Sequence, residues 1–118
     1  MAKIFWKGAT LLSPLPAVLV SCGEGEEKNL CTVAWTGIVC STPPMTYISL
    51  RPTRHSHGII SRTGEFAINL TTAAMCRKVD ACGVYSGRKV DKFKKYGFTP
   101  APAREIACPI VEDAPVSL

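Results

Sequence analysis

The sequence contains no closely spaced cysteine pair of the kind that metal sites and redox motifs use. Its six cysteines stand at positions 22, 31, 40, 76, 82 and 108, and none forms a CxxC motif. The two histidines are separated from Cys76 and Cys82 by roughly twenty residues, which is not the spacing of a zinc site. We therefore predict no metal site, and we interpret most of the cysteines as small buried hydrophobic residues rather than as a disulfide framework.

Long apolar runs are also missing. The continuous run at residues 17–20 is far shorter than the about 20 residues that a helix needs to cross a bilayer. Early lysines, an apolar stretch and a cysteine after a small residue give the N-terminus some likeness to a lipoprotein signal, but Pro14 and Pro16 interrupt the stretch. The following GEGEEKN fits a hairpin turn between two strands. We predict a cytoplasmic, reduced protein, with the signal interpretation as the alternative.

The excess of positive charge is small. A formal net charge of +5 makes an anionic partner plausible but does not choose among nucleotide, nucleic acid and membrane surface. The most basic segment, RKVDKFKK, lacks the interleaved aromatic residues of a nucleic-acid-binding surface. With 47% apolar residues in 118, the chain is long enough for one modest domain over residues 1–118. We predict no nucleic-acid partner and no membrane association.

Glycine and proline divide the chain into short elements. β-branched and aromatic residues predict strands at 16–22, 29–40 and 45–50, and the alternation of Phe66, Ile68 and Leu70 predicts a half-buried strand at 65–70. A short helix is expected from a cap at Ser56 to a stop at Gly64. Two further helices are expected at 73–85, capped by a threonine, and at 86–97. Residues 98–118 are rich in proline, and we expect loops with short extended pieces there.

A cluster of cations and hydroxyls, SLRPTRHSHGII, occupies residues 49–60. The predicted strand delivers Ser49 and Arg51 to a proline bend, and a helix begins near Ser56. Free N–H groups at a helix start, the partial positive dipole and a guanidinium fork can together bind a phosphate dianion. The cluster therefore predicts a phosphate site, and a solvated basic loop is the alternative.

The histidines of this cluster give weaker evidence. His55 and His57 would point the same way in an extended loop but diverge on a helix. Neither has a serine, cysteine or aspartate partner at a spacing typical of a catalytic triad, so a hydrolase has no specific support. His55 is a candidate phosphate neighbour, and the alternative makes both histidines ordinary surface residues.

The long stretch NLCTVAWTGIVCSTPPMTYISLRPTRHSHGIISRTGEFAINL resembles the core of the flavin reductase-like, FMN-binding split-barrel family, particularly its flavoredoxin branch. The downstream YSGRKVDKF is similar to that branch's SGxxVDKF segment, and the likeness covers nearly all of the chain. It implies a mainly β fold with short helices, an antiparallel split β-barrel, a homodimer, and FMN near the subunit interface. Family members usually continue past the segment represented by PVSL, so the domain over 1–118 is expected to be partial, with an unpaired sheet edge.

The resemblance also implies a set of cofactor-binding residues. Beside the isoalloxazine it places Asn29, Cys31, Thr32, Val33, Ala34 and Trp35. Toward the ribityl chain and phosphate it places Ser49, Leu50 and Arg51, with Arg54, His55 and Ser56 completing the phosphate grip and Lys92 adding a cation. From the residues alone, Trp35 on a strand is more often a core residue, and Lys92 belongs to a basic helix that is usually a solvated face.

Three functions follow as hypotheses. The first is an enzyme, an NAD(P)H:FMN oxidoreductase (flavin reductase), in which the flavin carries the redox chemistry and no catalytic protein residue is required. The second is a flavoredoxin-like electron carrier that keeps FMN bound and exchanges electrons with a protein redox partner. The third is a fragment or basic interaction domain without flavin chemistry.

Overall fold

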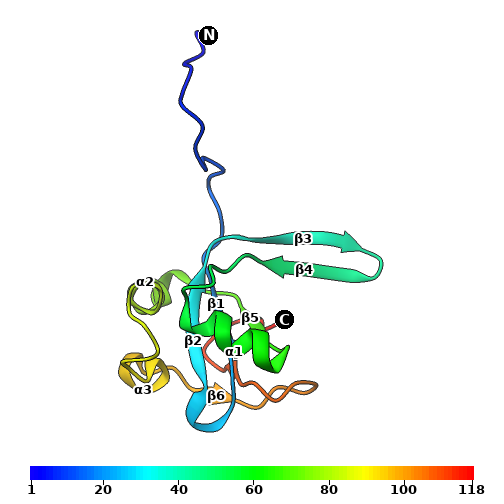
Figure 1. The fold of residues 1–118 in the computed structure, drawn as a ribbon, viewed down its shortest axis with the longest axis vertical. Helices are drawn as coiled ribbons and strands as arrows, with labels where there is room; N and C mark the ends of the chain where they lie inside the picture. Colours follow the sequence, from blue (N-terminus) through cyan, green and yellow to red (C-terminus); the bar gives the residue numbers. More distant parts are fainter.

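A three-stranded antiparallel sheet forms the centre of the computed structural model, which describes residues 1–118 (Figure 1). Strand β1 (Val18–Cys22) lies between β2 (Asn29–Val33) and β5 (Ala67–Asn69). All five residues of β1 are buried. This fits its mostly apolar sequence, VLVSC, because both faces of the strand are covered. The predicted first strand is thus confirmed.

The turn between β1 and β2 contains the short 3-10 helix η1 (Gly25–Glu27). Val20 pairs with Cys31, and Cys22 pairs with Asn29, as an antiparallel hairpin requires. Gly23 has a φ of +72° in this turn, and a Cβ there would lie 2.6 Å from the carbonyl oxygen of Glu27. Only glycine fits this conformation and space, so the predicted hairpin turn is confirmed.

The single strand predicted at 29–40 is wrong, because the chain breaks at Ala34 and Trp35. The N–H of Thr36 donates to the carbonyl of Ala34 over 3.1 Å, which closes a tight turn after β2. Two strands, β3 (Thr36–Ser41) and β4 (Pro44–Ile48), then form a separate hairpin that projects from the body of the molecule (Figure 1).

One face of the central sheet packs against α1 (His55–Thr63). This face carries the buried residues Val18, Val20, Cys31, Val33 and Ile68. The helix ends at Gly64, whose φ is +72° and whose N–H donates to the carbonyl of Ile60, as predicted. Ser56 was predicted as the cap, but Arg54 holds that position, and Ser56 is a buried residue of the first turn.

The opposite face packs against the remaining helices: η2 (Ala73–Met75), α2 (Cys76–Val84) and α3 (Lys92–Tyr96). The core on this side consists of Leu19, Leu30, Met75, Val79, Cys82, Phe93, Phe98 and Val111. The helix predicted at 86–97 is shorter than expected, since its first half is irregular. The side chain of Asp91 accepts a hydrogen bond from the N–H of Lys94 over 3.1 Å and starts α3.

The half-buried strand predicted at 65–70 corresponds to β5, which is shorter than predicted. All three of its residues are buried. Asn69 lies on the face expected to be open to solvent, yet its side chain accepts hydrogen bonds from the Val111 N–H and the Ser117 hydroxyl. The C-terminal segment covers this face and contributes the short strand β7 (Ile110–Val111), which pairs with β6 (Pro100–Ala101). Leu118 and Ile68 exchange two backbone hydrogen bonds, so residues 116–118 extend the sheet beside β5.

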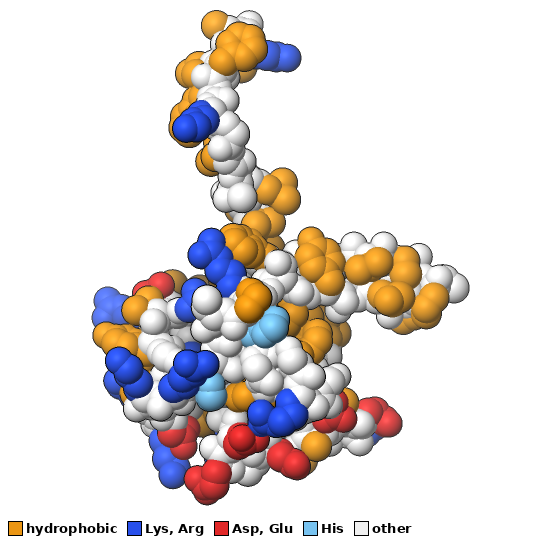
Figure 2. All heavy atoms as spheres, viewed as in Figure 1, with side chains coloured by type: hydrophobic (Ala, Val, Ile, Leu, Met, Phe, Trp, Pro, Cys, Tyr) orange, Lys and Arg blue, Asp and Glu red, His pale blue; other side chains and the backbone are white.

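The N-terminal segment, residues 1–16, leaves the body as an extended arm (Figure 1). Apolar side chains are exposed along this arm and along the β3–β4 hairpin (Figure 2). No helix in the structure has both the length and the apolar character needed to cross a membrane. Four of the six cysteines are buried, as the sequence predicted, and none forms a disulfide.

Candidate functional site

Two hollows lie where β2, the β4–α1 connection and the α2–α3 connection meet. The larger, of about 310 Å³, is lined by Thr32, Val33, Ala34, Trp35, Ser49, Leu50, Arg51 and Arg54. The smaller, of about 90 Å³, is lined by Asn29, Cys31, Thr53, Arg54, His55, Ser56, Val84, Tyr85, Ser86, Gly87 and Lys92. Arg54 borders both. Every residue of the predicted site lines one hollow or the other, and their role in binding a cofactor stays a prediction.

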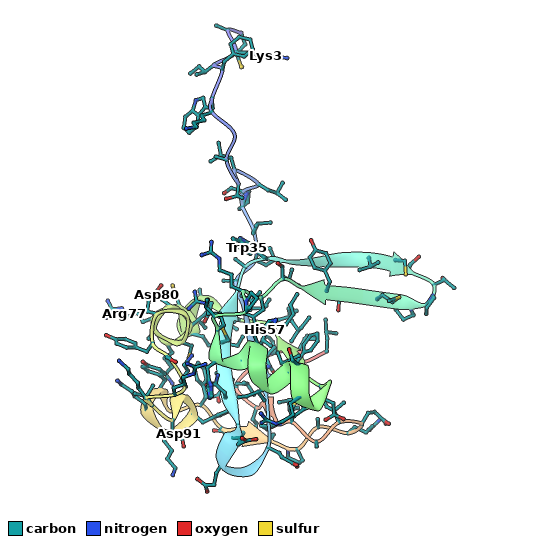
Figure 3. The ribbon with its side chains drawn as sticks, viewed as in Figure 1. Lys3, Trp35, His57, Arg77, Asp80 and Asp91 are labelled. Atoms are coloured by element: carbon teal, nitrogen blue, oxygen red, sulfur yellow. The ribbon has the colours of Figure 1, made fainter.

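The break after β2 builds the larger hollow. Trp35 lies at the base of the β3–β4 hairpin (Figure 3), where the N–H of Ser49 donates to its carbonyl over 2.7 Å. The Trp35 residue is 43% exposed, so the core alternative for this side chain is wrong. The Arg51 guanidinium lies 5.4 Å from the centroid of its ring, which is within cation–π range. An exposed aromatic face and a cation therefore share this hollow.

The connection into α1 brings a second arginine to the site. A turn closed by the Arg54 N–H and the Arg51 carbonyl, 3.0 Å apart, leads into the helix at His55. The Arg54 guanidinium donates through Nη1 to the carbonyl of Gly83 over 3.1 Å, which fixes it between the two hollows. The N–H groups at the start of a helix lack acceptors within it, although in α1 the His57 N–H donates to the carbonyl of the capping residue Arg54 over 3.0 Å. No acidic side chain stands in this first turn to oppose the positive end of the helix dipole. This arrangement is suited to an anion.

Buried polar groups form the floor of the smaller hollow. Asn29 Nδ2 donates a hydrogen bond of 2.8 Å to Ser56 Oγ, and both residues are buried. The backbone of Gly87 comes so close that a Cβ there would lie 2.1 Å from Asn29 Oδ1. Because Gly87 has no side chain, the Asn29 amide has room beside its backbone. The α2–α3 connection therefore covers one side of the hollow.

Lys92 is the buried cation of the site. The residue is 3% exposed, and its Nζ donates to the carbonyls of Leu30 and Cys82, each over 2.7 Å. The interpretation of Lys92 as part of a solvated face is therefore wrong. Burial lowers the pKa of its ammonium, and the charge of Arg54 lowers the pKa further. An ammonium has three N–H donors, so one remains beyond these two hydrogen bonds.

The two histidines diverge on α1, as expected for helix residues two positions apart. His55 lines the smaller hollow, whereas His57 borders neither hollow and lies 3.4 Å from the Ser61 hydroxyl. Burial lowers the pKa of His55, and the nearby charges of Arg88 and Lys92 lower it further. These causes favour a neutral imidazole beside the hollow.

Five lining residues of the smaller hollow were missed by the sequence analysis: Thr53, Val84, Tyr85, Ser86 and Gly87. Ser86 and Gly87 begin the SGRKVDKF segment, whose resemblance carried only Lys92 into the predicted site. Their close approach to Asn29 depends on how α2 and α3 pack, which the sequence pattern does not contain.

The chemistry of the lining points to an anion with a flat ring. Three cations, several hydroxyls and one exposed indole line the two hollows, and no aspartate or glutamate lines either of them. No serine or cysteine there has a hydrogen-bonded histidine that would activate it as a nucleophile. The two hollows therefore offer cations, hydroxyls and an aromatic face, and no activated nucleophile.

Comparison with known proteins identifies the family. The family model for the flavin reductase like domain matches residues 11–118. Flavoredoxin of Desulfovibrio vulgaris (Miyazaki F) is 34% identical, with a TM-score of 0.92 over 98% of this chain and 64% of that one. Flavoredoxin from Methanosarcina acetivorans is 25% identical, with a TM-score of 0.90 over 100% and 62% of the two chains. An uncharacterised protein of Pyrococcus abyssi is 31% identical over 92% of this chain and 62% of its own length.

The chain thus spans less than two thirds of the length of these relatives. The fold expected from the sequence, a mainly β split barrel with short helices, is confirmed by these matches, and the open, separate sheets agree with it. The chain belongs to the flavin reductase like domain family.

Proposed function

We propose that the two hollows together bind FMN. The supporting observation is the chemistry of the lining: two arginines, a buried lysine and an exposed tryptophan border the hollows, and no carboxylate does. In this proposal Arg51, Arg54 and the first turn of α1 hold the phosphate, since guanidinium groups and helix N-termini both favour phosphate oxygens. The indole of Trp35 provides an aromatic face for the ring.

The remaining site residues have proposed positioning roles. The residues proposed to border the isoalloxazine are Asn29, Cys31, Thr32, Val33 and Ala34. Ser49 and Leu50 border the ribityl chain, while Ser56 and a neutral His55 border the phosphate. Lys92 keeps β2 and α2 at fixed positions through its two hydrogen bonds and presents positive charge to the smaller hollow. When bound, FMN supplies hydride and single-electron transfer.

The proposed activity is NAD(P)H-dependent reduction of FMN, which makes the chain a flavin reductase. In this proposal the nicotinamide approaches the flavin from the side of the larger hollow, where Trp35 is partly exposed. Steady oxidation of NADH or NADPH that depends on added FMN supports this activity. Its absence in a chain that binds FMN contradicts it.

A flavoredoxin-like electron carrier is the second candidate. The observation that favours it is the 34% identity to a protein named flavoredoxin, with a TM-score of 0.92. In this candidate the protein keeps FMN tightly bound and exchanges electrons with a protein partner. Negligible turnover of NAD(P)H together with tight FMN separates this candidate from the first.

The experiment that tests the proposed function is a titration of the 118-residue chain with FMN, followed by the flavin absorbance spectrum and by fluorescence quenching. Binding with a shifted spectrum supports the proposal. Riboflavin, which lacks the phosphate, is the matched control and is expected to bind more weakly. A chain that leaves both the spectrum and the fluorescence of FMN unchanged would falsify the proposal and favour a basic interaction domain.

We also propose a homodimer and a cytoplasmic location. The β3–β4 hairpin, whose base at Trp35 lines the larger hollow, exposes the apolar side chains of Ile38, Val39, Met45 and Tyr47, and exposed apolar patches mark association surfaces. Analytical ultracentrifugation tests the dimer, and a monomer at micromolar concentration contradicts it. Six free cysteines agree with a reducing compartment, which cell fractionation tests.

A further inference from the structure

The positive charge of the molecule is concentrated in one segment. Residues 76–97 contain seven of the 14 lysines and arginines but only two of the nine acidic residues. This segment alone therefore has a formal charge of +5, equal to that of the whole chain, and the rest of the chain is neutral. The charge that the composition shows as a mild excess is a local feature of α2, α3 and their connection.

Six of these seven cations are exposed, and we refer to them as the basic face: Arg77, Lys78, Arg88, Lys89, Lys94 and Lys95. Figure 2 shows blue side chains over the side that carries α2 and α3, while red side chains gather at the lower edge of the molecule. The seventh cation, Lys92, is buried in the site. The molecule therefore presents a strongly polarised surface to solvent.

Two exposed apolar side chains of the same segment lie beside the site. Val84 and Tyr85 are 67% and 53% exposed, and both line the smaller hollow. Lys95 Nζ lies 4.8 Å from the centroid of the Tyr85 ring, so one cation of the basic face is in contact with this exposed aromatic side chain. Protein interfaces commonly have an apolar or aromatic centre with a charged rim. The surface thus has the composition of a docking site, and it lies against the proposed flavin site.

We propose that the basic face is the docking surface for an acidic electron-transfer protein, with Val84 and Tyr85 at the centre of the contact. Opposite charge would steer the partner onto this side of the molecule. The position is favourable for electron exchange, since the same two residues line the hollow. This inference rests on the proposed flavin-binding function, because an electron-transfer partner has a purpose only where a redox group is bound.

A nucleic acid fits the basic face less well. Figure 3 places Arg77 and Asp80 together on α2, with Asp91 at the start of α3 on the same side, and both aspartates are exposed. Carboxylates among the cations would repel a continuous phosphate backbone. A folded acidic protein carries its charges at discrete points, which can lie away from these two aspartates. We therefore infer an acidic protein as the partner.

The test measures the binding of a plant-type 2Fe–2S ferredoxin, a small acidic electron-transfer protein, to the 118-residue chain. Fluorescence anisotropy of labelled ferredoxin gives the affinity whether or not FMN is present. We expect the affinity to fall about tenfold or more between about 20 and about 300 mM NaCl, since salt screens exposed charges. Cytochrome c, a basic electron-transfer protein, is expected not to bind.

Two charge-reversal variants provide the decisive comparison. Lys89→Glu with Lys94→Glu reverses two cations of the basic face, whereas Lys3→Glu with Lys7→Glu makes the same change in net charge on the N-terminal arm. We expect the first pair to weaken ferredoxin binding about tenfold or more and the second to change it less than about twofold. All four lysines are exposed, so we expect both variants to fold. Thermal melts check this expectation.

Three results would overturn the inference: no ferredoxin binding, equal losses for the two variants, or tighter binding of a single-stranded DNA of about 20 nucleotides that depends on the same lysines. An FMN titration of the same preparations separates this inference from the proposed function. If FMN does not bind but ferredoxin binding depends on Lys89 and Lys94, the flavin proposal and the electron-transfer role both fail, and only the docking surface for an acidic protein stands. If FMN binds but ferredoxin does not, the docking surface fails and the flavin proposal stands.

Discussion

Asn29 Nδ2 donates a hydrogen bond of 2.8 Å to Ser56 Oγ, which joins the first residue of β2 to the first turn of α1. The two residues are 27 positions apart in the sequence and both are buried. Gly87 stands against the same asparagine from the α2–α3 connection. One buried amide therefore aligns three segments that line the smaller hollow, and this alignment makes its geometry sensitive to small substitutions.

Replacing Ser56 with alanine is expected to destabilise the fold. The substitution leaves the buried Asn29 Nδ2 without this acceptor, and an unsatisfied buried donor costs about 1–3 kcal/mol. Urea unfolding followed by circular dichroism measures the change in the free energy of unfolding. Ser61→Ala, on the exposed side of the same helix, is the matched control and should change stability by less than about 0.5 kcal/mol. Equal effects would show that the Asn29 contact contributes nothing.

Replacing Gly87 with alanine is expected to disturb the same site by overpacking. A Cβ at this position would lie 2.1 Å from Asn29 Oδ1, so the side chain or the loop must move, at a typical cost of about 1–3 kcal/mol. Gly58→Ala is the control, because a Cβ there meets nothing within 4 Å and alanine is favoured in a helix by about 0.5–1 kcal/mol. The two variants should shift the melting temperature in opposite directions. A Gly87 variant as stable as the parent chain contradicts the close approach.

Removing either site arginine is expected to weaken the binding of FMN much more than that of riboflavin. A hydrogen bond to a charged group contributes about 1.5–3 kcal/mol, so Arg51→Ala or Arg54→Ala should cost roughly ten- to a hundredfold in affinity for FMN. Isothermal titration with both ligands measures the difference. Arg104→Ala, an exposed arginine outside both hollows, is the control. Equal losses for FMN and riboflavin would argue against a phosphate role.

The sequence predicted the strands, turns and helix ends that depend on local signals. Gly64 ends α1 because its backbone adopts the left-handed conformation, and the acidic turn joins β1 to β2 as expected. The break at Trp35 was not predicted, since Val, Trp and Ile all favour a strand there. The tight turn between Ala34 and Thr36 is held in place where the chain comes back after the β3–β4 hairpin, because the Ser49 N–H donates to the Trp35 carbonyl. That contact joins distant residues and leaves no local pattern.

The candidate site was predicted largely through the resemblance, and the case of Lys92 shows why. Its sequence position, among the cations of RKVDKFKK, is that of a solvated helix face. In the fold the Lys92 ammonium reaches the carbonyls of Leu30 and Cys82, which lie in two other elements. Periodicity describes one helix at a time. It cannot identify a buried side chain whose hydrogen-bond partners are brought together by the packing of three elements.

The buried ammonium of Lys92 is expected to make stability depend on alkaline pH. Burial lowers its pKa in the folded chain below the ordinary 10.5, so between the two values the unfolded chain binds more protons and stability rises with pH. The free energy of unfolding of the parent chain relative to Lys92→Met should therefore increase as pH approaches 10.5. Burial raises the thiol pKa of Cys82 and of Cys108 to about 11, so both thiols lower the stability of the fold above pH 9. The Cys108 contribution is the same in both proteins and cancels in the difference. The Lys92 charge lowers the pKa of Cys82, so the Cys82 loss is larger in Lys92→Met and acts in the same direction as the expected increase. Lys94→Met, which removes an exposed cation two residues away, is the control, and its difference in the free energy of unfolding from the parent chain should not change with pH. If the difference for Lys92→Met does not change with pH either, the Lys92 ammonium stays fully hydrated and the prediction is wrong.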